Sequence, residues 1–289
     1  EDLATVNLDT RPYTVSNLAV PERLFDEIDA MRTRVAVHSA ELGQGNYADC
    51  TVFIDPIDGT REFSTHMGEH CTILFGVAID GRPAAGLVFG PLSSPVRWAL
   101  GCKHEQVWEA ELDSERALPT VSTPPHPHGL LTTNGSISPF TEALLVGLGA
   151  EHGVAPDELR VKAGGVGNKV LNLLEGKGGC YIQDRGVSRW DTCAAQAVIE
   201  AKGGVLAKLS RFVEDGSFES YRYERSAANL DVDAAWPPRL TAYNSINGSL
   251  KPYANVCGLL ALPSDDPAVV AKFKKLVDAA RKTSAPAFD

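Results

Sequence analysis

The sequence predicts a layered α+β or α/β protein in which helices cover sheets. Two observations carry this prediction. Residues 49–110 consist mostly of β-branched and aromatic runs, and residues 130–210 alternate strand-like runs with helix-like ones. A proline-rich polar stretch at residues 117–129 separates them. We therefore expect two domains, residues 1–129 and residues 130–289.

The first region reads as a series of strands. The runs are TVFI, CTILFGVAI, AAGLVFG, VRWAL and QVWEA, with turn dipeptides such as DG and GP between them. Pro56 lacks an amide hydrogen and fixes its own φ, so we expect the chain to turn at DPID instead of extending the first strand. The run REF, directly after Thr60, is expected to begin a short helix.

The second region alternates strands and helices. Its strand runs are LLTTN, LRVKAGG and GCYIQD, and its helix runs are PFTEALLVGLGA, NKVLNLLEG and DTCAAQAVIEAKGG. The last of these helices is expected to begin at Asp191 and to end at Gly203 and Gly204. Residues 211–253 are polar and irregular, as in an insertion. The run SDDPAVVAKFKKLVDAARK predicts a terminal helix, because its first turn is acidic and its end is basic.

Composition excludes several classes of protein. The 289 residues are 44% hydrophobic and 22% charged, which is typical of a globular core, and no apolar run is long enough to span a membrane. The net charge of −10 argues against binding to a nucleic acid polymer or an anionic membrane. The six cysteines include no C-x-x-C pair, so a reducing, cytoplasmic setting is expected. Oligomeric state is left open.

Asp55 and Asp58 lie three positions apart at the end of an apolar run. Both carboxylates can point to one side of a turn, which is costly unless a cation lies between them. Hard oxygen ligands of this kind suit Mg²⁺. Gly59 and Thr60 follow and offer backbone amides at the start of a short helix, where a phosphate can bind. The alternative is an ordinary Asp-Gly turn.

Two later features extend this pattern. Asp191 follows Trp190 at the start of a predicted helix, where its carboxylate can face a shared site or simply cap the helix. The run GGVGNK, residues 164–169, combines glycines that allow close ligand approach with Lys169; a structural glycine-rich turn is the alternative. Cys193 is expected to be a packed small residue, because no base is evident beside it.

The pairing of DPIDGT with WDTCAAQAVIEAKGG resembles the inositol monophosphatase superfamily, whose members are Mg²⁺-dependent, lithium-sensitive phosphomonoesterases. The segments VFIDPIDGTREF and AGGVGNKVLNLLEGKGGCYI are most similar to 3'(2'),5'-bisphosphate nucleotidases, and this resemblance implies that Lys169 reaches a second phosphate. The segments WDTCAA and YANVCGLLAL also resemble inositol polyphosphate 1-phosphatases. The resemblance implies an αβαβα sandwich of the sugar-phosphatase type. Since the chain opens abruptly at EDL, we expect the N-terminal helices of that fold, and an upstream acidic segment, to be missing from this chain.

The resemblance also implies roles by position. The implied metal ligands are Asp55, the backbone carbonyl of Ile57, Asp58, Asp191 and Glu1. The implied catalytic residues are Thr60, which would orient the attacking water, Asp58 and Glu1. The implied substrate-binding residues are Gly59, Thr60, Thr133, Gly165, Gly167, Lys169 and Asp191.

The activity implied is hydrolysis of a small bisphosphorylated metabolite with two or three Mg²⁺, without a covalent phosphoenzyme, and with inhibition by Li⁺. The leading substrate is 3'-phosphoadenosine 5'-phosphate, which would give AMP, and inositol 1,4-bisphosphate is the alternative. Ile137 stands where the nucleotidases have a histidine that contacts the nucleotide, so the position does not favour adenine. A non-catalytic member that binds phosphate and metal is a further alternative, and a sugar bisphosphatase is disfavoured by the GGVGNK and WDTCAA pairing.

Overall fold

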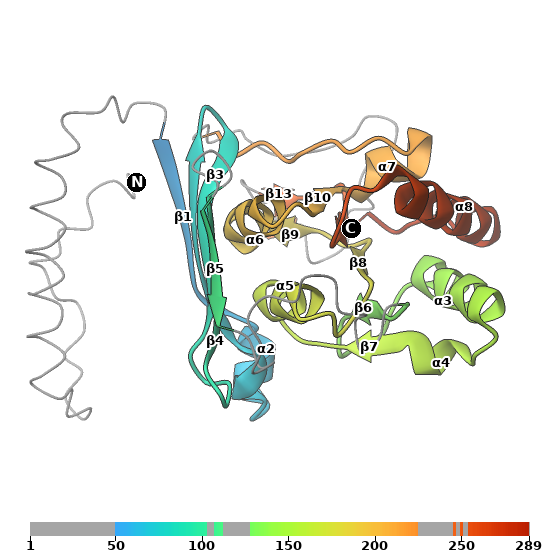
Figure 1. Ribbon diagram of the computed structural model, residues 1–289, viewed down its shortest axis with the longest axis horizontal. Coiled ribbons are helices and arrows are strands. Elements are labelled where there is room, and N and C mark those ends of the chain that lie inside the picture. The colour runs from blue at the N-terminus through green and yellow to red at the C-terminus, as the bar shows by residue number, and fades with distance from the viewer. Residues whose placement is uncertain are drawn as a thin grey trace, which may run out of the picture. The chain divides into compact units, whose positions relative to one another are not determined.

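The computed structural model describes most of the chain after residue 49. The described residues are 50–102, 107–111, 128–224, 245–246, 249–250 and 254–288. They form two five-stranded sheets, and the layers alternate sheet, helix, sheet, helix (Figure 1). The predicted layered class is confirmed. The N-terminal helical layer of an αβαβα sandwich concerns residues outside this set.

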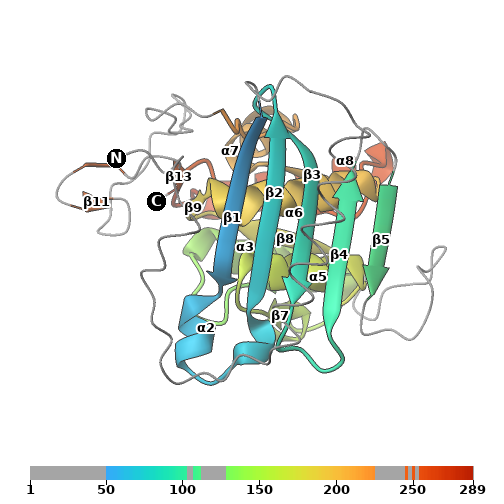
Figure 2. The ribbon, with the colours of Figure 1, turned by 90° about the vertical axis from the view of Figure 1, so that its left-hand side faces the viewer.

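The first sheet is antiparallel throughout and follows chain order (Figure 2). Its strands are β1 (Cys50–Asp58), β2 (Thr72–Ile79), β3 (Arg82–Gly90), β4 (Arg97–Cys102) and β5 (Val107–Glu111). All five match predicted strand runs. The predicted DG turn joins β2 to β3, where Asp80 and Gly81 both have positive φ, as two-residue hairpin turns require.

Helix α6 (Arg189–Ala201) packs against a row of glycines on this sheet. Gly76, Gly86 and Gly101 are direct neighbours on β2, β3 and β4. A Cβ atom at Gly86 would lie 2.5 Å from the carbonyl oxygen of Ala194 in α6. Only glycine allows so close an approach of helix backbone to sheet, so the row fixes where α6 crosses.

The second sheet is mixed, with strand order β10-β14-β8-β6-β7. Its strands are β10 (Val205–Lys208), β14 (Leu259–Leu262), β8 (Cys180–Gln183), β6 (Leu130–Thr132) and β7 (Arg160–Lys162). Only the β8–β6 and β6–β7 pairs are parallel. Side chains alternate along these strands: Leu131 and Tyr181 face the core shared with α5 and α6, whereas Leu130 and Ile182 face the core shared with α3 and α8.

The long helices confirm the predicted helix runs, and several short elements were not expected. The predicted helices are α3 (Pro139–His152), α5 (Val166–Leu174), α6, α8 (Pro267–Thr283) and, after Gly59, α2 (Thr60–Ser64). The unexpected elements include strands β10 and β14 of the second sheet and several shorter pieces. These pieces are η3 (Gly68–His70), α4 (Pro156–Leu159), α7 (Leu209–Asp215), and the short strand pairs β9 (Val187–Ser188) with β13 (Ala254–Asn255) and β11 (Ser245–Ile246) with β12 (Ser249–Leu250). The irregular structure expected from residue 211 is therefore wrong for its first residues, which belong to α7, and the prediction of an insertion at residues 211–253 stays a prediction.

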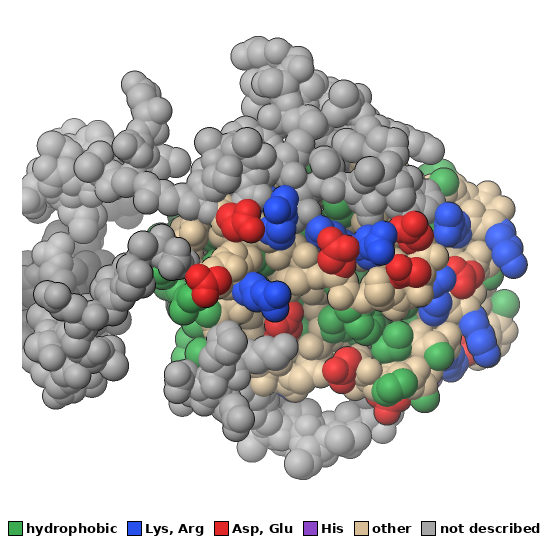
Figure 3. All heavy atoms as spheres, turned by 90° about the horizontal axis from the view of Figure 1, so that it is seen from above, with side chains coloured by type: hydrophobic (Ala, Val, Ile, Leu, Met, Phe, Trp, Pro, Cys, Tyr) green, Lys and Arg blue, Asp and Glu red, His purple; other side chains and the backbone are tan. Residues whose placement is uncertain are grey.

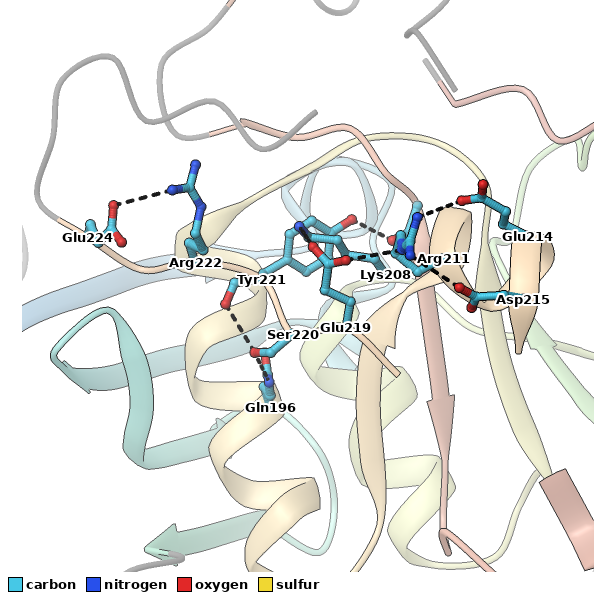
Figure 4. Close-up of polar contacts among 11 residues, drawn as sticks. Gln196, Lys208, Arg211, Glu214, Asp215, Glu219, Ser220, Tyr221, Arg222 and Glu224 are labelled. Atoms are coloured by element: carbon cyan, nitrogen blue, oxygen red, sulfur yellow. Dashed lines mark hydrogen bonds and ion pairs between the residues drawn. The ribbon is translucent and has the colours of Figure 1, made fainter. Parts of the chain in front are cut away.

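Residues 219–222, after α7, run along α6 and bind to it by hydrogen bonds (Figure 4). Glu219 pairs with Lys208 at 2.6 Å, and Ser220 accepts a hydrogen bond from Gln196 of α6. Arg189, which is fully buried at the start of α6, donates to the backbone carbonyl of Arg222. A buried guanidinium is stable only when its donors are satisfied, so this segment helps to fix the first turn of α6.

Charges of both signs are interspersed on the face seen in Figure 3. The ion pairs of the described residues include some within helices, such as Arg211 with Glu214 in α7 and Lys274 with Asp278 in α8. No helix in the described part of the chain is long and apolar enough to cross a bilayer. The predicted domain boundary at residues 129/130 adjoins residues 112–127, outside the described set, and stays a prediction.

Candidate metal and phosphate site

A bulge at the end of β1 brings two carboxylates to the same face. Asp55 pairs with Leu74 of β2 and Asp58 pairs with Thr72, so two residues of β1 oppose one of β2. Residues three apart on a regular strand point to opposite faces, and the extra residue reverses this. The predicted turn at DPID is therefore corrected. The chain continues as a bulged strand, and Pro56 lies in the bulge, where the ladder is interrupted.

Asp191 completes the cluster from the other side of the core. One carboxylate oxygen from each of Asp55, Asp58 and Asp191 lies within 4.8 Å of the other two. The three aspartates predicted as metal ligands are therefore together, although they come from β1 and α6. Among the described residues this is the one group of three or more His, Cys, Asp or Glu side chains that is so close.

The position of Asp191 in its helix differs from the prediction. Helix α6 begins at Arg189 with Ser188 as its N-cap, and Asp191 is the third helical residue. The Asp191 carboxylate accepts a hydrogen bond from the backbone amide of Ser188 at 2.7 Å, which completes a capping box. This bond fixes one carboxylate oxygen of Asp191.

Three hydrogen bonds from described residues fix the Asp58 carboxylate. Its Oδ2 accepts from the Thr72 hydroxyl at 2.8 Å and the Gly167 amide at 2.7 Å, and its Oδ1 accepts from the Val166 amide at 3.0 Å. The two amides belong to the first turn of α5, so a carboxylate occupies the positive end of that helix. Burial raises the pKa of Asp58, and these hydrogen bonds oppose the rise.

The glycines of GGVGNK admit Asp58 and Thr72 at close range. A Cβ atom at Gly165 would lie 2.8 Å from Asp58 Oδ2, and one at Gly167 would lie 2.2 Å from Thr72 Oγ1. Gly165 also has a φ of +63°, which favours glycine. The close approach expected of a ligand is thus made by the protein's own side chains, and contact of Gly165 and Gly167 with substrate stays a prediction.

The donor set fits Mg²⁺. Burial and the neighbouring charges of Asp58 and Asp55 raise the pKa of Asp191 well above its ordinary value, because three carboxylates so close repel one another. A hard cation relieves that repulsion, and carboxylate oxygens are the ligands Mg²⁺ prefers. Backbone amides fix one oxygen of Asp55, through Ile57, and one of Asp191.

The predicted phosphate donors lie next to this cluster in the chain. Gly59 has a φ of +87° and caps the five-residue helix α2, whose first residue is Thr60. Thr60 is exposed, and its hydroxyl has no hydrogen bond with a described residue. The Ile57 side chain is exposed as well, and its backbone carbonyl as a metal ligand stays a prediction. Glu1 lies outside the described residues.

A polar network beside Asp58 was not predicted. Glu62 is buried and accepts from the Asn134 side chain at 3.3 Å. The Asn134 amide also lies 3.3 Å from His70 Nδ1, which accepts from the Gly164 backbone amide at 3.2 Å. The sequence around His70 has no pattern that indicates a role for it. The side chains of Glu62, His70 and Asn134 come together only in the fold.

Lys169 lies inside the protein. It is 4% exposed, and its Nζ lies 5.0 Å from the ring centroid of Tyr181. Burial lowers the pKa of Lys169, and the charges of Asp58, Glu62 and Asp191 oppose that change. Lys169 therefore acts first as a buried countercharge to the acidic cluster, and its reach to a second phosphate stays a prediction.

Cys193 has the packed role expected from sequence. It is fully buried in α6, and burial raises its pKa to about 12. A Cβ atom at Gly76 would lie 2.9 Å from the Cys193 sulfur, so the side chain fills the contact between α6 and the first sheet.

A family model described as the inositol monophosphatase family matches residues 6–230. The chain belongs to this family. The 3'(2'),5'-bisphosphate nucleotidase 1 of Rattus norvegicus is 26% identical over 162 residues, which cover 56% of this chain and 50% of the relative. The putative inositol monophosphatase 3 of Drosophila melanogaster is 28% identical over 208 residues, or 71% of this chain and 56% of the relative. The chain thus spans about half the length of these curated relatives.

A solved structure of an inositol monophosphatase from Zymomonas mobilis has the same fold. Its TM-score against this chain is 0.50 at 18% identity, over 86% of this chain and 80% of that one. The superfamily and the fold expected from DPIDGT and WDTCAA are both confirmed.

Proposed function

We propose that this protein is a Mg²⁺-dependent phosphomonoesterase that hydrolyses a small bisphosphorylated metabolite. The observation that carries the proposal is the convergence of Asp55, Asp58 and Asp191 within 4.8 Å. These three carboxylates would hold the metal. When bound, Mg²⁺ supplies Lewis-acid stabilisation to the phosphoryl group and to water. The nucleotidase named among the relatives supports the substrate class.

The chain's own residues suit the rest of the reaction. Thr60, exposed at the start of α2, is free to orient a water molecule beside the cluster. The backbone amides of Gly59 and Thr60 are the donors we assign to phosphate. Buried Lys169 supports the position of Asp58 and Asp191 by its charge.

The test is phosphate release from a panel of phosphomonoesters, with Mg²⁺ and with EDTA. Wild-type protein should release phosphate only with Mg²⁺, and Li⁺ should inhibit. Asp58→Asn should lower kcat by roughly a thousandfold, because several kcal/mol of charge stabilisation depend on the metal. Asp157→Asn, on exposed α4, is the matched control and should behave as wild type. Equal activity of Asp58→Asn and wild type would refute the proposal.

A comparison of two substrates decides between the nucleotide and inositol alternatives. We place 3'-phosphoadenosine 5'-phosphate first, and inositol 1,4-bisphosphate is the alternative. Ile137 lines the cavity beside α2 and offers an apolar contact there, without a hydrogen bond. The substrate with the higher kcat/KM is the assigned one. A protein that binds both with Mg²⁺ but hydrolyses neither would be the non-catalytic member of the family.

We also propose a cytoplasmic location. The support is that all six cysteines are free, which is usual in a reducing compartment. Fractionation of cells that express the tagged full-length protein tests this. Recovery with secretory membranes would contradict it.

A further inference from the structure

We propose that Arg61 and Arg185 form a subsite that binds the second phosphate of the substrate, the one that is not hydrolysed. The inference rests on the proposed function and names the residues that would make the protein prefer bisphosphates to monophosphates. It is carried by a cavity that is lined by Arg61, the residue directly after Thr60, and by Arg185, so that two guanidinium groups share one cavity.

The cavity has a volume of about 160 Å³ and is bounded by three segments. Residues 132–138, between β6 and α3, form one wall, and residues 182–185, at the end of β8, form another. Arg61 comes from α2, next in the chain to Thr60. Since Thr60 follows the DPIDG segment directly, the cavity adjoins the place where the hydrolysed phosphate would bind.

The wall beside Arg61 is held in shape by another arginine. Arg160 of β7 donates to the backbone carbonyls of Thr133 at 3.2 Å and Gly135 at 2.5 Å. A Cβ atom at Gly135 would lie 3.0 Å from Nη1 of Arg61, so glycine lets the Arg61 guanidinium lie against this wall. The donors of Arg160 are used by the protein, whereas those of Arg61 remain for a ligand.

Arg61 and Arg185 have no counterion among the residues that the structure describes. Neither guanidinium makes a hydrogen bond or ion pair with any residue in the described ranges, and both residues are exposed. The one acidic residue that lines the cavity is Asp184. It is 4% exposed, and its carboxylate accepts from the Ala287 amide at 3.0 Å. Two unpaired guanidiniums in one cavity are suited to a phosphate, which accepts their paired N–H groups.

Lys169 is not placed to bind a second phosphate in this structure. Its ammonium is buried over Tyr181 and responds to the charges of Asp58 and Asp191. A second phosphate that stays in contact with solvent needs cations at the surface of the cavity, and Arg61 and Arg185 are there. The net charge of −10 makes such a local positive site necessary for a highly anionic substrate.

The first test is equilibrium binding of a product, because a product keeps only the second phosphate. Adenosine 5'-monophosphate and inositol 4-phosphate are titrated by calorimetry into the full chain in EDTA, which removes metal-dependent phosphate binding. Arg61→Gln and Arg185→Gln should each weaken binding of the preferred product by about tenfold, the loss of a charge-assisted hydrogen bond. Arg82→Gln, an exposed arginine on β3, is the control and should bind as wild type.

The second test is substrate selectivity with Mg²⁺. The ratio of kcat/KM for 3'-phosphoadenosine 5'-phosphate to that for adenosine 3'-monophosphate should fall at least tenfold in the double variant, mainly through KM of the bisphosphate. The inositol pair is 1,4-bisphosphate against 1-phosphate. Arg61→Lys and Arg185→Lys should restore part of the ratio. Thermal denaturation confirms that the variants are folded.

The outcomes separate this inference from the proposed function. Wild-type protein that hydrolyses no phosphomonoester refutes the proposed function, and the binding test in EDTA still decides on the subsite. Wild-type protein that is active, with product affinity and selectivity unchanged in the double variant, overturns the subsite alone. A proportional loss on mono- and bisphosphate substrates also overturns it, because the arginines would then act on the reacting phosphate.

Discussion

Asp58 depends on residues that lie far from it in the sequence. The motif DPIDGT predicts that Asp58 is a metal ligand, but the hydroxyl that binds Asp58 is 14 residues away in the sequence and the Gly167 amide is 109 residues away. The sequence shows the glycines of GGVGNK, but it does not show which group packs against them. A glycine shows that something approaches closely, and only the fold shows that here it is a carboxylate.

His70 illustrates a residue with no local signal at all. Its Nδ1 accepts from Gly164, at the start of the segment that binds Asp58 through the Val166 and Gly167 amides. A histidine that precedes a strand carries no pattern of its own. The role of His70 follows from its hydrogen bond to Gly164, which holds the segment that binds Asp58.

At this residue we predict different effects of two substitutions. His70→Leu removes the acceptor and leaves the buried Gly164 amide unsatisfied, so the protein should lose about 1–3 kcal/mol of unfolding free energy. The Mg²⁺ concentration for half-maximal activity should rise several-fold, because Asp58 loses its fixed position. His70→Asn keeps an acceptor at the same distance from the backbone and should keep most of both properties. Urea unfolding and Mg²⁺ titration measure them, and equal losses in the two variants would contradict the prediction.

The long elements could be predicted from the sequence, and several short ones could not. The strands of the first sheet and helices α3, α5, α6 and α8 have enough residues for a hydrophobic period to appear. Helices α4 and α7, with four and seven residues, do not. The start of α6 was placed two residues late, at Asp191 instead of Arg189, because Asp191 is a favourable residue at a helix start, whereas the N-cap is Ser188.

The close contact between α6 and Gly86 of the first sheet leads to a prediction for a substitution at this glycine. In Gly86→Ala the new methyl group would lie 2.5 Å from the Ala194 carbonyl oxygen, so α6 must move away from the sheet. We expect a loss of about 1–3 kcal/mol in unfolding free energy, as for overpacked cores, and weaker Mg²⁺ binding because α6 carries Asp191. Urea unfolding and Mg²⁺-dependent activity measure these effects.

Gly147→Ala in α3 is the matched control for that substitution. Its methyl group would make an ordinary contact of 3.6 Å with Leu276, and alanine favours the helix. This variant should be as stable as wild type or more stable by up to about 1 kcal/mol. A similar loss in both variants would show that the glycine row does not limit the approach of α6.

For the whole molecule, the sequence predicted the layers but not how they make one site. Residues of β1 and α6 meet because a bulge turns Asp58 inward and a row of glycines lets α6 cross the sheet. Neither the bulge nor the row is periodic, so neither appears in a hydrophobic pattern. The family resemblance supplied the pairing of the aspartates, and the fold supplies its physical cause.

The acidic cluster should make the stability of the whole protein depend jointly on pH and Mg²⁺. Burial raises the pKa of both Asp58 and Asp191 above the ordinary value of 3.8. A carboxyl with a raised pKa in the folded state costs stability as pH rises through that pKa, because the unfolded chain ionises more easily. In EDTA this contribution therefore falls as pH increases above about 4, whereas bound Mg²⁺ compensates the ionised groups.

We expect the difference in Tm between Mg²⁺ and EDTA samples to grow as pH rises from about 5 to 8. Contributions from other titrating groups are common to both samples and cancel in the difference. Asp191→Asn removes one of the repelling charges, so its Tm in EDTA at pH 8 should exceed that of wild type, and its gain with Mg²⁺ should be smaller. Differential scanning calorimetry at constant ionic strength measures both. A difference in Tm that stays constant across this pH range would mean that the carboxylates do not share a cation, since protons and metal would then not compete for them.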